Sequence, residues 1–202
     1  MSKVTIQGDA SGTGIFTIAS PNSNTDRTLV LPDEAGTVLT TAGVPASAMP
    51  AGSVIQVVSV TKTDVASGTN TTFADVAGLS VSITPSSASN KILVIANVTG
   101  NGTALSNHLR LALVRNSTQI ALGDADALRI RLSGWIYNSD GYGIGSSVTT
   151  HLDSPNTTSA VTYKVQASCE NNTWYINRSS SDPNNYTAGR SVSSITIMEI
   201  AG

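Results

Sequence analysis

The sequence is short of charge. Asp, Glu, Lys and Arg make up 12% of its 202 residues, about half the share of an average globular domain. The formal net charge is −2, so the chain has no basic excess with which to displace counterions from a phosphate backbone. We therefore do not expect nucleic acid as a partner, and we expect Ser, Thr, Asn and Gly to solubilise the surface.

Cysteine is nearly absent. Cys169 stands alone, which excludes an intrachain disulfide and a cysteine-rich metal site. It continues an alternating apolar row that starts at Val161, so we expect a buried thiol in the core. The chain also lacks an apolar run of about 20 residues and an apolar leader at its start. We expect neither membrane insertion nor a signal peptide.

Helical periodicity is missing as well, and alternation with period two takes its place. It is clearest at 79–83, 109–113, 128–132 and 161–169. Turn residues separate such runs at short intervals. This pattern predicts an all-β protein with nine or ten strands, a jelly-roll-like antiparallel β-sandwich. An immunoglobulin-type sandwich is the alternative, but it needs a cysteine pair that this chain cannot supply.

Three predicted strands are apolar on both faces, at 53–60, 91–98 and 193–200. A sandwich covers only one face of each sheet, so the second face needs a cover from outside. We expect a neighbouring copy of the chain to supply it. The residues predicted to pack between subunits are Ile92, Leu93, Val94, Ile95, Ile195, Ile197, Met198 and Ile200.

The first 45 residues differ in kind from the rest. Short β-like pieces alternate with small polar residues, and they are too few for a core of their own. We predict an extended N-terminal arm at 1–45, a linker at 46–52 and the β-sandwich head at 53–202. The residues predicted to attach the arm to other chains are Leu29, Leu31, Val38 and Leu39.

Catalytic patterns are thin. His108 and His151 lie in or near predicted strands, and no G-x-S-x-G motif accompanies them. Asp124 and Asp126 could share a cation, but a turn in which these carboxylates bind local amides is the favoured interpretation. We predict a protein that is not an enzyme and has no cofactor.

One stretch is suited to binding carbohydrate, because aromatic faces and nearby hydrogen-bonding groups recognise sugars. It contains Trp135, Tyr137, Asp140 and Tyr142. Trp174 and Ile176, in a second aromatic stretch, alternate as core residues do.

The stretch from GIFTIASP through TLVLPDEAGTVLTTAG resembles a segment of bacteriophage tail-fibre and virion surface proteins. In that segment a short strand, a Leu-Pro pair, an acidic-Gly turn and a Val-Leu-Thr-Thr-x-Gly tail follow in order. FADVAGLSVSITPSSASNKILV and the closing SSITIMEIAG are also similar to such proteins.

The resemblance implies a homotrimer on the virion surface, with an N-terminal segment for attachment and a C-terminal head. The motif occurs once, without a repetitive shaft, which favours a compact trimer. We expect a capsid decoration (cement) protein that contacts the major capsid protein or another virion protein. The alternative is a short tail fibre or receptor-binding tip that recognises host surface glycan. A polysaccharide-degrading tailspike would need repeats that this chain lacks.

Overall fold

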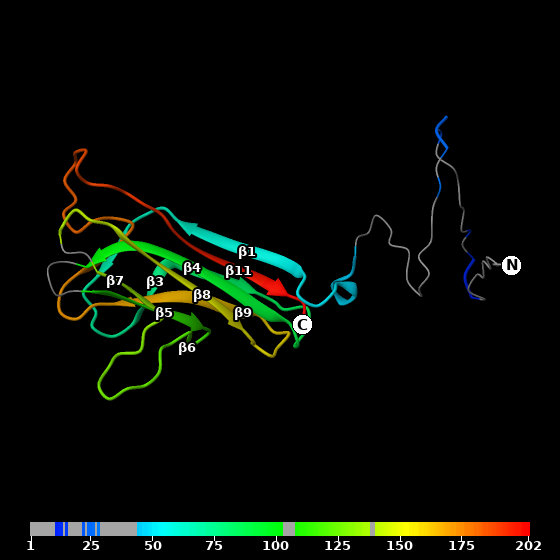
Figure 1. The fold of residues 1–202 in the computed structure, drawn as a ribbon, viewed down its shortest axis with the longest axis horizontal. Coiled ribbons are helices and arrows are strands. Elements are labelled where there is room, and N and C mark those ends of the chain that lie inside the picture. The colour runs from blue at the N-terminus through cyan, green and yellow to red at the C-terminus, as the bar shows by residue number, and fades with distance from the viewer. Residues whose placement is uncertain are drawn as a thin grey trace. The chain divides into compact units, whose positions relative to one another are not determined.

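The structure of the chain is a computed structural model with two compact units, Met1–Leu39 and Thr40–Gly202. Each unit is considered by itself. The residues that the structure describes are 11–13, 15, 22, 24–26, 28, 44–102, 108–137 and 140–202. The second unit is the head, and Figure 1 shows it as a ribbon with most of its strands labelled.

The described part of the head contains eleven strands and one short helical turn, Ala46–Ala48. The chain is therefore all-β, as the alternation predicted. The strands are β1 (Val54–Lys62), β2 (Ala66–Gly68), β3 (Ala74–Ile83), β4 (Lys91–Gly102), β5 (Leu109–Arg115), β6 (Thr118–Ile120), β7 (Gly134–Ile136), β8 (Gly145–Asp153), β9 (Val161–Ser168), β10 (Trp174–Ile176) and β11 (Ser193–Ile200).

The strands form two antiparallel sheets that pack face to face. Sheet A has the order β1-β11-β4, with β8 and β10 also paired to β4 and β2 paired to β10. Sheet B has the order β3-β9-β5-β6, with β7 also paired to β5. When the short β2, β6 and β10 are set aside, sheet A has the order β1-β11-β4-β8 and sheet B has the order β3-β9-β5-β7. Counted along the chain, these eight strands have the orders 1-8-3-6 and 2-7-4-5. This is the interlocking arrangement of a jelly roll.

The core lies between the two sheets and follows the alternation in the sequence. In β9 the residues Val161, Tyr163, Val165 and Ala167 are all buried, and Cys169 after the strand is fully buried too. Its thiol donates to the backbone carbonyl of Asn172 at 2.8 Å. The predictions of a buried core thiol and of buried residues in β3 and β5 are confirmed.

Trp174 fills one end of the core. Its indole N–H donates to the Asn70 side-chain oxygen at 3.0 Å, and the ring lies against Gly68 of the neighbouring β2. A Cβ on Gly68 would come within 2.6 Å of the indole, so glycine is what allows the two strands to approach. The prediction that Trp174 and Ile176 are core residues is confirmed.

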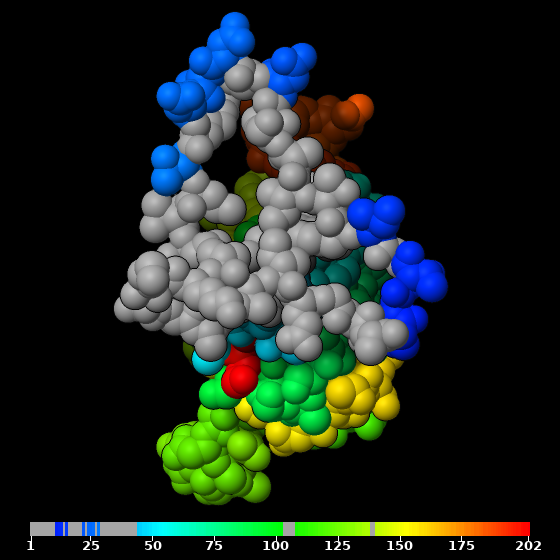
Figure 2. Space-filling view, turned by 90° about the vertical axis from the view of Figure 1, so that its right-hand side faces the viewer, coloured from blue at the N-terminus to red at the C-terminus, as the bar shows by residue number. Residues whose placement is uncertain are grey.

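Two predictions about strands are wrong. Residues 128–132 alternate like a strand but form a loop, because no strand of the described head pairs with them; the loop between β6 and β7 projects from the head (Figure 2). The strand predicted at 91–98 is too short, because β4 continues to Gly102. Gly100 permits this, because a Cβ there would collide with the Tyr175 carbonyl oxygen of the paired β10.

Candidate functional site

The outer face of sheet A carries an apolar row that crosses four strands. Val57 of β1 lies opposite Met198 of β11, Met198 lies opposite Leu93 of β4, and Leu93 lies opposite Leu152 of β8. Directly opposed residues of antiparallel strands point to the same side. Val57 is 54% exposed and Leu152 is 50% exposed, so nothing in the described chain covers the two ends of this row.

The next two rows toward the other end of the sheet continue the same character. The first combines Ile95 with hydroxyl residues, and Ser59 bonds Thr196 within it at 2.8 Å. The second contains the exposed Val148. None of the twelve residues in the three rows is ionisable. We call them the sheet-A face: Val57, Ser59, Thr61, Leu93, Ile95, Asn97, Val148, Thr150, Leu152, Ser194, Thr196 and Met198.

The outer face of sheet B is built in the opposite way. Asp75 accepts hydrogen bonds from Lys164 at 2.6 Å and from Gln166 at 2.8 Å, and Gln119 donates to Gln166 at 3.3 Å. The Lys164 bond, followed by the Gln166 bond, lowers the pKa of the Asp75 carboxyl below its ordinary value. Long polar side chains flank the buried Val114 on this face. This part of sheet B covers its outer surface with paired polar groups, whereas the sheet-A face leaves aliphatic side chains exposed.

An aromatic cluster lies at one end of the outer face of sheet B. The ring of His108 is 4.7 Å from the ring of Trp135 and 5.2 Å from that of Tyr137, measured between centroids. The β5–β7 pairing places Leu109 opposite Ile136 and both are buried, so the residues beside them point outward. Trp135 is 56% exposed and Tyr137 is 47% exposed. We call His108, Trp135 and Tyr137 the aromatic cluster.

The other two residues predicted to contact sugar lie in the following loop. The carboxylate of Asp140 accepts the backbone N–H groups of Tyr142 at 2.8 Å and Gly143 at 2.5 Å. Asn101 of β4 fixes this loop by donating to the carbonyls of Asp140 and Gly143. The Asp140 carboxylate thus holds its own turn, while the Tyr142 ring is exposed.

A buried carboxylate lies at the opposite end of sheet A. Glu199 is fully covered and accepts hydrogen bonds from Gln56 at 2.5 Å, Asn90 at 2.6 Å, and the Ser86 amide and hydroxyl at 2.6 and 2.8 Å. Burial alone raises the pKa of a carboxyl group, but these four donors outweigh it. The net effect is a pKa of Glu199 below its ordinary value, so the group is a structural anion.

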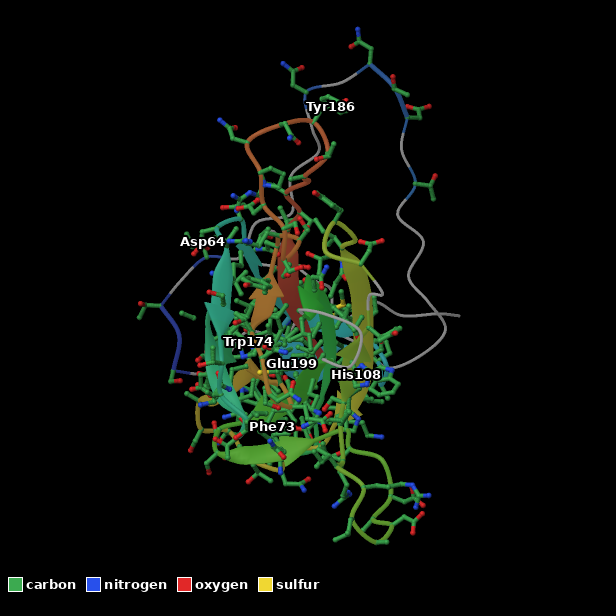
Figure 3. The ribbon with its side chains drawn as sticks, turned by 90° about the vertical axis from the view of Figure 1, so that its left-hand side faces the viewer. Asp64, Phe73, His108, Trp174, Tyr186 and Glu199 are labelled. Atoms are coloured by element: carbon green, nitrogen blue, oxygen red, sulfur yellow. The ribbon has the colours of Figure 1, made fainter. Side chains whose placement is uncertain are left out.

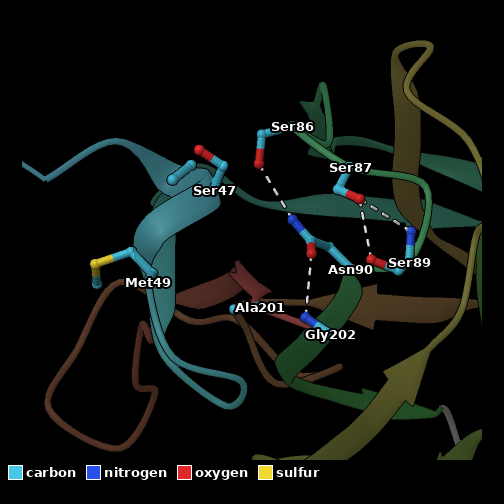
Figure 4. A pocket seen from close by; sticks show the side chains of 9 residues that line it. Ser47, Met49, Ser86, Ser87, Ser89, Asn90, Ala201 and Gly202 are labelled. Carbon is cyan, nitrogen blue, oxygen red and sulfur yellow. Dashed lines mark hydrogen bonds between the residues drawn. The ribbon is translucent and has the colours of Figure 1, made fainter. Parts of the chain in front are cut away.

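A polar pocket of about 290 Å³ lies beside this network (Figure 4). Asn90 bridges its wall, because its amide donates to Ser86 and its oxygen accepts the Gly202 amide at 3.1 Å. The lining consists of small hydroxyl and aliphatic residues without an ionisable side chain: Ala46, Ser47, Met49, Ser86, Ser87, Ser89, Asn90, Ala201 and Gly202. This lining supplies neither a nucleophile with a base nor a set of metal ligands.

The prediction for subunit packing needs correction. Ile92, Val94, Ile195 and Ile197 are completely buried between the two sheets of one chain. They point inward because they alternate with the outward residues, so they are not available to another subunit. Leu93, Ile95, Met198 and Ile200 are partly exposed on the outer side. The predicted attachment residues Leu29, Leu31, Val38 and Leu39 lie outside the described residues.

The remaining candidates show no catalytic or metal arrangement. Asp126 pairs with Arg129 inside its loop, and the interpretation that the carboxylates of this segment bind local amides stays a prediction. Within the described ranges no group of three His, Cys, Asp or Glu side chains could hold a metal ion. His151 is partly exposed in β8. The helical turn Ala46–Ala48 is the only helix there, and it is far too short to cross a bilayer.

Sequence reasoning missed two features of these sites. His108 lies near a predicted strand without a predicted partner, yet it is half-buried and contacts two aromatic rings. Its position one residue before β5, opposite the residue after β7, could have been found only from the pairing. Glu199 was not singled out, although it alternates with the outward residues of β11 just as the buried Ile195 and Ile197 do.

Comparison with known proteins identifies no relative, because neither a family model nor a curated protein matches the chain.

Proposed function

We propose that the chain is a non-enzymatic structural protein of a bacteriophage particle, a homotrimer displayed on the virion surface. The observation that carries this proposal is the uncharged sheet-A face with its exposed Val57, Val148 and Leu152. The location on a virion is supported by the resemblance of the N-terminal segment to phage surface proteins.

The contrast between the two outer faces supports self-association. A sheet that is meant to face water can cover itself with ionic and amide groups, as Asp75, Lys164 and Gln166 do on sheet B. The sheet-A face instead offers aliphatic and hydroxyl groups, which lose little on leaving water. Another copy presents the same uncharged chemistry, so no unpaired charge would be buried when copies meet.

A capsid decoration role is the favoured form of this proposal. A decoration protein acts mechanically, because area buried between copies and against the shell resists the separation of shell subunits. Stable contacts of this type bury about 1,200–2,000 Å². In this proposal the head forms the trimer, and the N-terminal arm contacts the major capsid protein or another virion protein.

Self-association can be tested by placing charge on the sheet-A face. We expect the full chain to sediment at three times its chain mass of 20.7 kDa at micromolar concentration. The double variant Leu93→Asp, Met198→Asp should sediment as a monomer, because like charges would meet in a dry contact. The matched control is Ser80→Asp, Ser82→Asp on the exposed outer side of β3, which should remain trimeric. A monomeric wild-type chain would refute the proposal.

The virion role is tested separately with the particles themselves. The double variant Leu29→Asp, Leu31→Asp should fail to load onto particles, while the circular dichroism and melting of its head stay unchanged. Electron microscopy of labelled protein on intact particles would distinguish the shell from the tail. Normal loading of the variant would show that the arm is not the anchor.

The alternative function, a tail-fibre or receptor-binding tip that recognises host glycan, is favoured by a different observation. The aromatic cluster exposes two large rings that the head does not use in its core. Labelling confined to the tail would select this alternative over decoration.

A further inference from the structure

The aromatic cluster is held rigidly on paired strands. Arg110 of β5 lies directly opposite Trp135 of β7. His108 is two residues before Arg110 and Tyr137 is two residues after Trp135, so both point to the same side of the sheet. The His108 ring is tilted by 44° to Trp135 and by 57° to Tyr137, within the range of ordinary aromatic contacts. Three rings and a guanidinium thus share one end of the outer face of sheet B.

Polar groups border the cluster on one side. Arg110 is mostly buried, and its guanidinium bonds the exposed Glu170 at 3.2 Å. Arg110 also lies opposite Ser168 on β9. The pair places donors and acceptors beside the Trp135 ring without adding net charge.

A shallow depression of about 310 Å³ lies on the other side, where Trp135 forms one wall together with Leu132, Ser133 and Gly134. A Cβ on Gly134 would lie too close to the Ser147 hydroxyl of β8, which would have to turn aside. The volume is at the low end of the roughly 300–1,000 Å³ of small-molecule sites, enough for one ring of a ligand.

The packing of the head does not require Trp135 to be exposed. Trp174, the other tryptophan, is buried and hydrogen-bonded, whereas Trp135 leaves more than half of its surface in water. Exposed aromatic groups beside satisfied polar groups are typical of ligand contacts, because their large rigid faces bind with little loss of entropy.

We propose that the aromatic cluster binds a neutral pyranose unit of a polysaccharide, with the sugar ring stacked on Trp135 and its hydroxyl groups facing Arg110 and Glu170. The ring of a pyranose has an apolar C–H side that fits an aromatic face and an edge of hydroxyls that fits a neutral ion pair. A phosphate or nucleic-acid ligand is disfavoured, because Glu170 already compensates the guanidinium and the chain has a net charge of −2.

This inference does not depend on the proposed self-association, which uses the outer face of the other sheet. Its test is a titration of the full ¹⁵N-labelled chain with the methyl pyranosides of glucose, galactose, mannose, rhamnose and N-acetylglucosamine. The chain has two tryptophans, so its NMR spectrum should contain two indole N–H signals. We expect at least one sugar to shift the Trp135 signal in a saturable manner and to leave the buried Trp174 signal in place.

Variants decide whether the shift reports this site. Trp135→Ala removes the reporting indole, so its binding is followed through the backbone amide signals of β5 and β7, whose sugar-dependent shifts should disappear. Tyr137→Ala should weaken the affinity by about tenfold, as the loss of one aromatic contact predicts. Tyr186→Ala is the matched control, because Tyr186 is a fully exposed aromatic residue in the loop between β10 and β11 (Figure 3). It should bind like the unaltered chain.

Three results would overturn the proposal. One is the absence of a Trp135 shift with all five sugars. A second is a sugar response that survives in Trp135→Ala. The third is a Trp135 shift produced by a proline-rich peptide and by none of the sugars, because aromatic surfaces also bind polyproline helices. Melting curves of both Ala variants would show that any loss of binding is not a loss of folding.

Discussion

At the scale of single residues, Glu199 is the most consequential buried group of the head. Its two oxygens share four donors from two parts of the chain, Gln56 near the start of β1 and Ser86 and Asn90 in the β3–β4 turn. A buried charge is costly unless it is hydrogen-bonded in this way. The carboxylate therefore joins the turn at 84–90 to the last strand.

The variant Glu199→Gln should destabilise the head by about 2–4 kcal/mol, because an amide loses the charge and turns donor hydrogens toward existing donors. Urea unfolding monitored by circular dichroism measures this loss. Glu170→Gln, which affects an exposed carboxylate, should cost less than about 1 kcal/mol. Equal losses in the two variants would contradict the assigned role.

Glu199 also sets a pH dependence. Its pKa in the folded chain lies below the ordinary value of 4.5, so the unfolded chain binds the proton more readily. The stabilisation is complete well above pH 4.5 and is lost as the pH falls through that value toward the folded pKa. The melting temperature of the wild-type chain should therefore drop more steeply between pH 5 and pH 3 than that of Glu199→Gln, as differential scanning calorimetry would show.

Tyr163 belongs to a second buried cluster of hydrogen-bonded side chains, with Asp153 and Arg115. Its hydroxyl donates to Asp153 at 2.6 Å, and Arg115 donates to both oxygens of the same carboxylate. Burial, with the Asp153 bond next in size, raises the pKa of the Tyr163 hydroxyl far above its ordinary value. Tyr163→Phe removes one donor and should cost about 1–2 kcal/mol in urea unfolding, whereas Tyr142→Phe at an exposed site should change nothing measurable.

Which side chains are buried could largely be predicted from the alternation of apolar and polar residues along the strands. Cys169 and Trp174 were identified as core residues because each continues an alternating row. Glu199 continues such a row too, but a charged residue at an inward position is identified only if its partners are known. Those partners are distant in sequence, so the pattern could not reveal them.

At the scale of elements, alternation predicts a strand only where a neighbour exists. Residues 128–132 alternate as clearly as those of β5, yet Leu128 is 99% exposed and belongs to a loop. The loop holds itself by local bonds, such as that from Arg131 to the carbonyl of Gly123 at 2.6 Å. Side-chain periodicity carries no information about whether a partner strand is available.

The same loop leads to a prediction at the scale of one element. Replacing 124–130 by two glycines should leave the melting temperature within about 2 °C of the wild-type value, because none of these seven residues belongs to the buried core or packs against it. Differential scanning fluorimetry measures the shift. A drop of more than about 5 °C would show that the loop packs against something that stabilises the head.

At the scale of the whole molecule, the sequence predicts the class of the fold, a β-sandwich, but not which strands pair with one another. The number of strands and their short turns indicated a sandwich, but the pairing of β1 with β11 joins residues at opposite ends of the head. Local patterns cannot select such pairs. The expectation that strands with two apolar faces need outside cover remains a prediction, and sheet A is the one to which it applies.

The last prediction separates the head from the arm. The buried core of the described chain runs from Val76 to Ile197, and the sheet-A face also belongs wholly to the second unit. A fragment of residues 40–202 should therefore fold with an unchanged melting temperature and, under the proposed function, should sediment as a trimer. A folded monomer would place the subunit contact in the arm, and an unfolded fragment would contradict the independence of the head. Adding Leu93→Asp and Met198→Asp to the fragment should yield a folded monomer, because the charges affect only a surface that the isolated sandwich leaves in water.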